Sequence, residues 1–175
     1  MILKKIRSIL IVLVLITAAY VIQTCSLIPG RFTMPNLLIM LTSFFGFIGG
    51  KKYGMYTGFV CGLLIDIFSG SVLGFNAVIF LYTGFVCGFF NKLYYDSSLL
   101  FPAVLAGGSD LIYNFVFYII RFLLRNKLDV GFYFINVMLP EAIMTALFAV
   151  LLYKAVDALY ERFLKTMTRS EMIID

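Results

Sequence analysis

Long stretches without a charged residue constrain this chain more than any other feature of its sequence. The stretch between Arg7 and Arg31 is uncharged, and most of its residues are aliphatic. A helix needs roughly 20 residues to cross about 30 Å of hydrocarbon. Over the whole chain 62% of residues are hydrophobic and 13% are charged, whereas about 25% are charged in a soluble domain. The chain is therefore predicted to be an integral membrane protein, and a soluble domain, a disordered chain and a disulfide scaffold are excluded.

Charged residues and turn residues such as Pro29 and Gly30 divide the chain into six apolar segments. The predicted fold is all-α, with about six transmembrane helices forming one multi-pass domain over 1–175. A basic start followed by an apolar run also describes a signal peptide, but the length of the first segment favours an uncleaved anchor. The predicted spans are 6–28, 35–50, 53–69, 73–91, 99–124 and 133–156, followed by a cytoplasmic tail over 157–175.

The second and third spans are the shortest, since 16 helical residues reach only about 24 Å. A re-entrant hairpin, with four full spans in the chain, is the alternative for this region. Pro35 is expected in the first turn of the second helix, where its missing N–H is harmless. Lys51 and Lys52 are expected to form the turn after that helix, and Pro140 to kink the last span.

The basic residues predict the orientation in the membrane. With a cytoplasmic N-terminus, ten Lys and Arg fall inside and four outside, as the positive-inside bias requires. Both termini are then cytoplasmic, and the net charge of +5 reflects topology and contact with lipid headgroups rather than nucleic acid. The inside set is Lys4, Lys5, Arg7, Lys51, Lys52, Lys92, Lys154, Arg162, Lys165 and Arg169, and the outside set is Arg31, Arg121, Arg125 and Lys127.

Residues that carry out chemistry are scarce. The chain has no histidine, which is the commonest metal ligand and proton shuttle. Cys25, Cys61 and Cys87 lie in or beside apolar runs and form no C-x-x-C pair. The sequence therefore predicts neither an enzyme nor a metal or cofactor site.

Glycine recurs at every fourth residue from Gly46 to Gly62, and the spacing ends in Asp66. Small residues let transmembrane helices approach closely. Two interpretations stay open: packing between the third and fourth spans, or a docking face for another membrane protein. Leucine at Gly58 or Gly62 is expected to be disruptive, and alanine to be accommodated by a small shift. The candidate residues are Gly54, Gly58, Gly62, Asp66, Gly74, Asn76, Gly84 and Gly88.

Two groups of polar residues fall inside the apolar segments. Asp66, near the outer end of its helix, opposes the helix dipole and needs a partner. Backbone N–H groups of the turn at 68–72 are one interpretation, and Arg121, Arg31 or another protein are the others. In the fifth span Asp110, Asn114 and Arg121 share one face, which predicts an internal hydrogen-bond stripe, with ion translocation as the alternative.

Several of these residues also form a family pattern. PNLL at 35–38 is followed by GFVCGLLIDIFSGSVLGFNA at 58–77 and then by Gly84 and Gly88. The order of these pieces resembles the rod shape-determining protein MreD family, and the likeness extends over most of the chain. Glu141, which follows Pro140 and is a candidate partner of Arg121, departs from the family pattern.

The resemblance implies a non-catalytic subunit of the bacterial cell-elongation machinery in the cytoplasmic membrane. Members of the family associate with the bitopic protein MreC, and through it with MreB filaments and peptidoglycan synthases. The family is similar in fold to the substrate-binding subunits of energy-coupling-factor transporters. A small-molecule-binding subunit of such a transporter is the alternative function. The adjacent Ala18 and Ala19 do not form the A-x-x-x-A face of those subunits, which argues against it.

Overall fold

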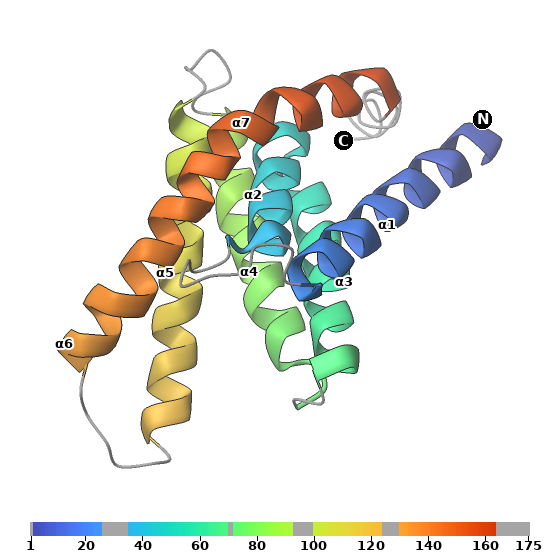
Figure 1. Cartoon of the computed structure of the whole chain (residues 1–175). Helices are drawn as coiled ribbons and strands as arrows, with labels where there is room; N and C mark the ends of the chain where they lie inside the picture. Colours follow the sequence, from blue (N-terminus) through green and yellow to red (C-terminus); the bar gives the residue numbers. More distant parts are fainter. Residues whose placement is uncertain (1, 26–34, 70–71, 93–99, 124–129, 164–175) are drawn as a thin grey trace.

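The computed structural model describes residues 2–25, 35–69, 72–92, 100–123 and 130–163, and every regular element in these ranges is helical (Figure 1). The predicted all-helical fold is therefore confirmed for this part of the chain. The elements are α1 (Ile2–Thr24), α2 (Leu37–Gly49), α3 (Lys51–Ser69), α4 (Phe75–Phe89), the 3-10 turn η1 (Phe90–Lys92), α5 (Leu100–Leu123), α6 (Val130–Tyr133), the π-helical turn η2 (Phe134–Met138) and α7 (Leu139–Phe163).

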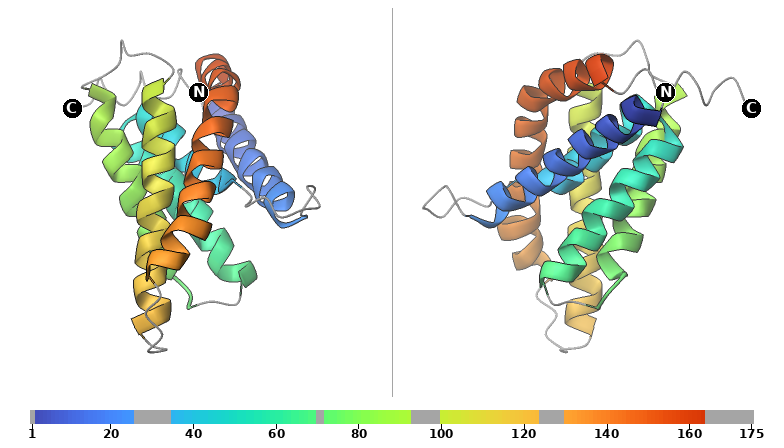
Figure 2. Two further views of the ribbon diagram at one scale, coloured as in Figure 1. Left: turned by 60° about the vertical axis from the view of Figure 1, so that its left-hand side comes forward. Right: turned by 90° about the vertical axis from the view of Figure 1, so that its right-hand side faces the viewer.

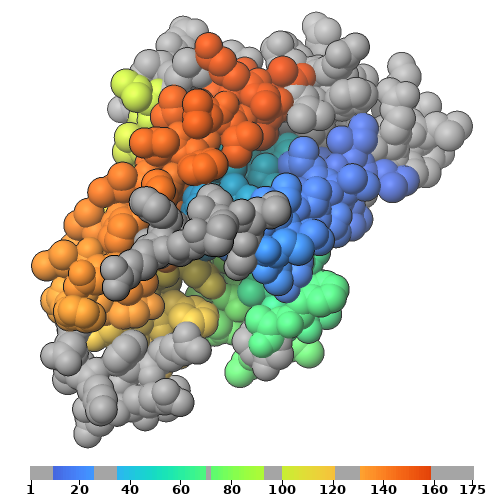
Figure 3. Space-filling model, viewed as in Figure 1, coloured from blue at the N-terminus to red at the C-terminus, as the bar shows by residue number. Residues whose placement is uncertain are grey.

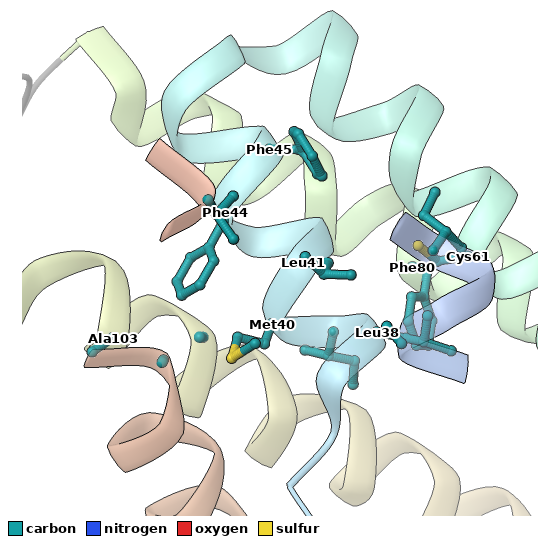
Figure 4. Packing of buried hydrophobic residues seen from close by; sticks show 14 residues of the cluster. Leu38, Met40, Leu41, Phe44, Phe45, Cys61, Phe80 and Ala103 are labelled. Atoms are coloured by element: carbon teal, nitrogen blue, oxygen red, sulfur yellow. The ribbon is translucent and has the colours of Figure 1, made fainter. Parts of the chain in front are cut away.

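The short helix α2 is the centre of the bundle. All residues from 38 to 47 are buried, so the helix has no solvent- or lipid-facing stripe over this length. Figure 4 shows its side chains directed to several sides, toward Cys61 of α3, Phe80 of α4 and Ala103 of α5. In the space-filling view α7 and α1 lie in front, with only a narrow part of α2 visible between them (Figure 3). The most apolar short segment of the sequence thus forms the core.

The peripheral helices differ in how they pack on this core. Helices α3 and α4 lie side by side (Figure 2, right), and α1 crosses the bundle obliquely in both Figures 1 and 2. Helix α5 runs antiparallel to the continuous helical stretch of α6, η2 and the first part of α7, and the last part of α7 bends away across the end of the bundle (Figures 1 and 2). The bundle therefore consists of an α3–α4 pair and an α5–α7 pair on either side of α2.

Two turns differ from the sequence-based expectation. Lys51 and Lys52 are not in the turn but in the first turn of α3, because Gly50 alone reverses the chain with a φ of 84°. Pro35 is not in the first turn of α2 but precedes the N-cap residue Asn36, whose side chain accepts a hydrogen bond from the N–H of Ile39 at 3.4 Å. An Asn N-cap satisfies an N–H group that has no helical partner.

The last helix adjusts its winding at the proline. The π-helical turn η2 precedes Pro140, and the N–H of Leu139 donates to the carbonyl of Phe134, five residues back. Proline lacks an N–H and its ring crowds the carbonyl four residues earlier, and a wider turn relieves both constraints. Helix α7 then continues to Phe163, beyond the predicted end of the last span at 156.

The described helices differ in whether they are long enough to cross a membrane. Two helical stretches in the described residues are long and apolar enough to span a bilayer, namely Leu100–Ile120 and Gly131–Ala158. The apolar stretches Leu10–Thr24 and Leu37–Gly49 are shorter, and the 13 residues of α2 extend only about 20 Å. The prediction of six full spans therefore stays a prediction.

Candidate functional site: the glycine seam and the buried carboxylates

The candidate glycines line a seam where α3 and α4 come into backbone contact. A Cβ atom added at Gly62 would lie 2.5 Å from Cα of Ala77, and one added at Gly88 would lie 2.5 Å from Cα of Lys51. Between these two levels, a Cβ at Gly58 would overlap the backbone of Phe80. The two helices can approach this closely only because these positions have no side chain. The glycine seam is defined as Gly46, Gly54, Gly58, Gly62, Gly84 and Gly88.

The central helix enters the same seam. A Cβ at Gly46 of α2 would lie 2.7 Å from the carbonyl oxygen of Gly84, and Gly54 and Gly84 face each other across α3 and α4. Three backbones therefore meet at one level. This geometry also corrects the expected tolerance of alanine: the atoms in the way of a methyl group belong to backbone, which cannot move aside as a flexible side chain does.

Asp66 joins the end of α3 to the start of α4. Its carboxylate accepts hydrogen bonds from the backbone N–H groups of Gly74 at 2.9 Å, Asn76 at 3.1 Å and Ala77 at 3.1 Å. These described donors are the N-cap residue and two residues of the first turn of α4, beyond the turn at 68–72 that the sequence suggested. A carboxylate is stabilised at a helix N-terminus by both the free N–H groups and the helix dipole. Asp66 thus caps α4 from a distance.

Asn76 extends this contact to α5. Its amide nitrogen donates to Asp66 at 2.8 Å, and its amide oxygen accepts from the hydroxyl of Tyr113 at 3.0 Å. Gly74, the N-cap residue, adopts a φ of 95°, which only glycine adopts without strain. Asp66, Gly74 and Asn76, all chosen from the sequence, therefore belong to one buried arrangement.

Asn91 makes a similar connection at the other end of the α3–α4 pair, and sequence reasoning did not identify it. Its amide nitrogen donates to the carbonyls of Phe47 and Ile48 in the last turn of α2, the latter at 3.1 Å. The ammonium of Lys51 lies 4.4 Å from the ring centre of Phe89. The α2–α3 turn is thereby attached to the end of α4.

Asp110 lies in a second polar group, formed by α5, α7 and α2. Its side chain is fully buried, and its Oδ2 accepts a hydrogen bond from the hydroxyl of Thr145 at 3.0 Å. The same hydroxyl oxygen accepts from the backbone N–H of Asn36 at 3.1 Å. Sequence reasoning identified Asp110 but missed Thr145 and Asn36. Asn36 stands directly before an apolar run, and this position is a sequence signal for a helix N-cap that could have identified it.

The other members of the predicted stripe are only partly described. Asn114 lies one turn after Asp110 on α5. Arg121 is a residue of α5 whose side chain lies outside the described part of the chain. The expected pairing of Arg121 with Glu141 or Asp66 is therefore untested. In the described ranges no three His, Cys, Asp or Glu side chains gather where they could hold a metal ion.

Comparison with known proteins adds one finding. The family model described as rod shape-determining protein MreD matches residues 4–163. No curated protein and no solved structure matches the chain significantly. The similarity in fold to the substrate-binding subunits of energy-coupling-factor transporters accordingly stays an expectation.

Proposed function

The chain belongs to the rod shape-determining protein MreD family, a family of membrane proteins, and on this premise we propose that it is a non-catalytic subunit of the cell-elongation machinery. In this proposal it sits in the bacterial cytoplasmic membrane with about six spans and both termini in the cytoplasm. It binds an MreC-like bitopic protein. Through that partner it supports lateral peptidoglycan synthesis by linking MreB-like filaments to the synthases.

The structural role of the family motif supports a scaffold. In the stretch 58–77, Gly58 and Gly62 allow backbone contact, while Asp66 caps the helix that Gly74 and Asn76 begin. These side chains serve the α3–α4 hairpin, and none is set beside a second reactive group in a catalytic arrangement among the described residues. A motif that builds a rigid hairpin suits a protein that presents a surface to partners.

The seam itself is an unsuitable docking face. Its glycines lie between α2, α3 and α4, so another transmembrane helix cannot reach them while the bundle is intact. We therefore place the partner on a different surface of the bundle. Of the two interpretations of the glycine spacing, internal packing is the one we carry forward.

Partner capture tests the function directly. We expect the full-length tagged chain, solubilised from its native membrane in mild detergent, to retain a bitopic MreC-like protein that mass spectrometry identifies. The Gly108→Ala variant serves as a control and is expected to retain the same partner, because an added Cβ at Gly108 meets no atom within 4 Å. Consistent capture of a transport ATPase in place of the bitopic protein would instead support the transporter alternative.

The orientation is tested by thiol labelling in a background without Cys25, Cys61 and Cys87. We expect Lys51→Cys and Lys92→Cys to react only after the membrane is permeabilised, because basic residues stay on the cytoplasmic side. Lys127→Cys is expected to react in intact cells. Labelling of the Lys51→Cys variant from outside would contradict the six-span topology.

A further inference from the structure

The contact between α5 and α7 holds two layers of polar side chains. In the first layer Thr145 donates to Asp110, and both side chains are fully buried. The helices approach closely here, because a Cβ at Gly107 would lie 3.0 Å from Cβ of Ala146. This close, antiparallel approach fixes which residues of the two helices stand opposite one another.

The second layer lies one helical turn away. Asn114 follows Asp110 by four residues on α5, and Glu141 precedes Thr145 by four residues on α7, so in antiparallel helices they fall at the same level. The carboxylates of Glu141 and Asp110 are close enough to interact electrostatically. Two acidic groups therefore share one region of the helix bundle.

This region is incomplete in hydrogen bonding and in charge. Oδ1 of Asp110 is buried and accepts no hydrogen bond from any described residue. A carboxylate buried in a medium of low polarity is costly unless an opposite charge and hydrogen bonds compensate it. A second carboxylate nearby raises that cost. Among the residues whose side chains the structure describes, no positive charge compensates this pair, so a cation would complete the site.

We propose that Asp110 and Glu141 together bind one monovalent cation, a proton or Na⁺. A proton would lie on one of the two carboxylates and remove the repulsion between their charges. Na⁺ would be held by oxygen atoms, the ligands that hard cations prefer, from the two carboxylates, the hydroxyl of Thr145 and the amide oxygen of Asn114. The amide orientation of Asn114 is interchangeable, since its O and N ends have the same shape.

Other titratable or charged groups also face this pair. Tyr113 on α5 interacts electrostatically with Glu141, Asp110 and Asp66. Helix α2 contributes only the neutral Asn36. Arg121 is the rival counter-charge, and its Cα lies seven residues, about 10 Å along the helix, beyond Asn114. The experiment must therefore separate a bound cation from this arginine.

The thermal stability of the purified full chain in lipid nanodiscs provides the first test. For Na⁺, we expect Tm to rise by about 2–4 °C when NaCl replaces choline chloride at constant ionic strength. For a proton bound more tightly in the folded state, we expect Tm to be highest at low pH and to fall as the pH rises toward 8. The dependence should vanish in Asp110→Asn and Glu141→Gln, and persist in the control Asp157→Asn, an acid elsewhere on α7.

Two results would overturn the proposal: a wild-type Tm that responds to neither Na⁺ nor pH, or a response that Asp110→Asn leaves intact. Loss of the response in Arg121→Gln alone would assign the compensating charge to Arg121 and overturn it as well. If a variant fails to fold, the response of the wild-type Tm to Na⁺ and pH and the chemical labelling of the wild-type chain still test the proposal. Dicyclohexylcarbodiimide, which modifies protonated buried carboxyl groups, is expected to label Asp110 or Glu141 but not the fully hydrogen-bonded Asp66. Protection by Na⁺ identifies the metal ion, labelling indifferent to Na⁺ identifies the proton, and absence of labelling together with no ²²Na⁺ binding refutes both.

Discussion

Alanine at Gly58 or Gly62 is expected to destabilise the protein strongly, and leucine at either position is expected to prevent folding. The added methyl group would overlap the backbone of Phe80 or lie 2.5 Å from Cα of Ala77, so α3 and α4 would have to separate. Overpacking costs about 1–3 kcal/mol per site, occasionally more, and backbone obstruction belongs at the upper end of that range. The effect should exceed that of any substitution on the outside of the bundle.

The matched control is Gly108→Ala on α5, where an added Cβ meets nothing within 4 Å. This substitution is expected to be neutral or to stabilise by up to about 1 kcal/mol, because alanine favours helix more than glycine does. Thermal unfolding can be followed with a thiol-reactive dye, since the free thiols of Cys61 and Cys87 are buried. The exposed Cys25 is replaced by serine in all variants.

Equal stability of the Gly58→Ala, Gly62→Ala and Gly108→Ala variants would refute backbone contact along the seam. A different result would revive the docking interpretation: variants that stay folded, with an unchanged Tm, but lose the MreC-like partner. We expect partner capture to fall only in proportion to the folded fraction, because the seam lies between α2, α3 and α4.

Removal of the Asp66 carboxylate is the second change with a large expected effect. Asp66→Ala leaves the N–H groups of Gly74, Asn76 and Ala77 without their acceptor at the buried start of α4. Hydrogen bonds to charged groups contribute about 1.5–3 kcal/mol each, and an orphaned buried donor costs about 1–3 kcal/mol. Since these contributions are not additive, we expect a loss of at least about 3 kcal/mol in the free energy of unfolding.

Graded variants separate the capping role from simple loss of a side chain. Asp66→Asn retains one acceptor oxygen and is expected to be less harmful than Asp66→Ala. Asn76→Ala removes one donor to Asp66 and the contact with Tyr113, and should rank below both. Thr83→Ala is the control on α4, because its hydroxyl bonds only within the helix, to the carbonyl of Ile79. A Tm for Asp66→Ala equal to that of Thr83→Ala would disprove capping by Asp66.

The sequence alone determined the class of protein, an all-helical membrane protein. The free energy of transferring a segment from water to hydrocarbon is a sum over the residues of that segment. It does not depend on neighbouring segments, so it can be judged from an uncharged apolar run alone. The family pattern at 35–38 and 58–77 was also readable, and the match over residues 4–163 bears it out. Several bounds differ from the prediction: Lys51 and Pro35 changed place at turns, and the last helix continues to Phe163.

Only the tertiary structure decided which groups meet. The four-residue glycine spacing suits contact with any helix, and it is the packing of α3 on α4 that sets Gly62 against Ala77 and Gly54 against Gly84. Asn36 reaches Thr145 across 109 residues of sequence, a pairing that no local pattern encodes. Burial of a polar side chain depends on what packs against it rather than on its own neighbours in sequence. For this reason the sequence identified Asp66 and Asp110 as groups in need of partners, and the fold alone determined the partners.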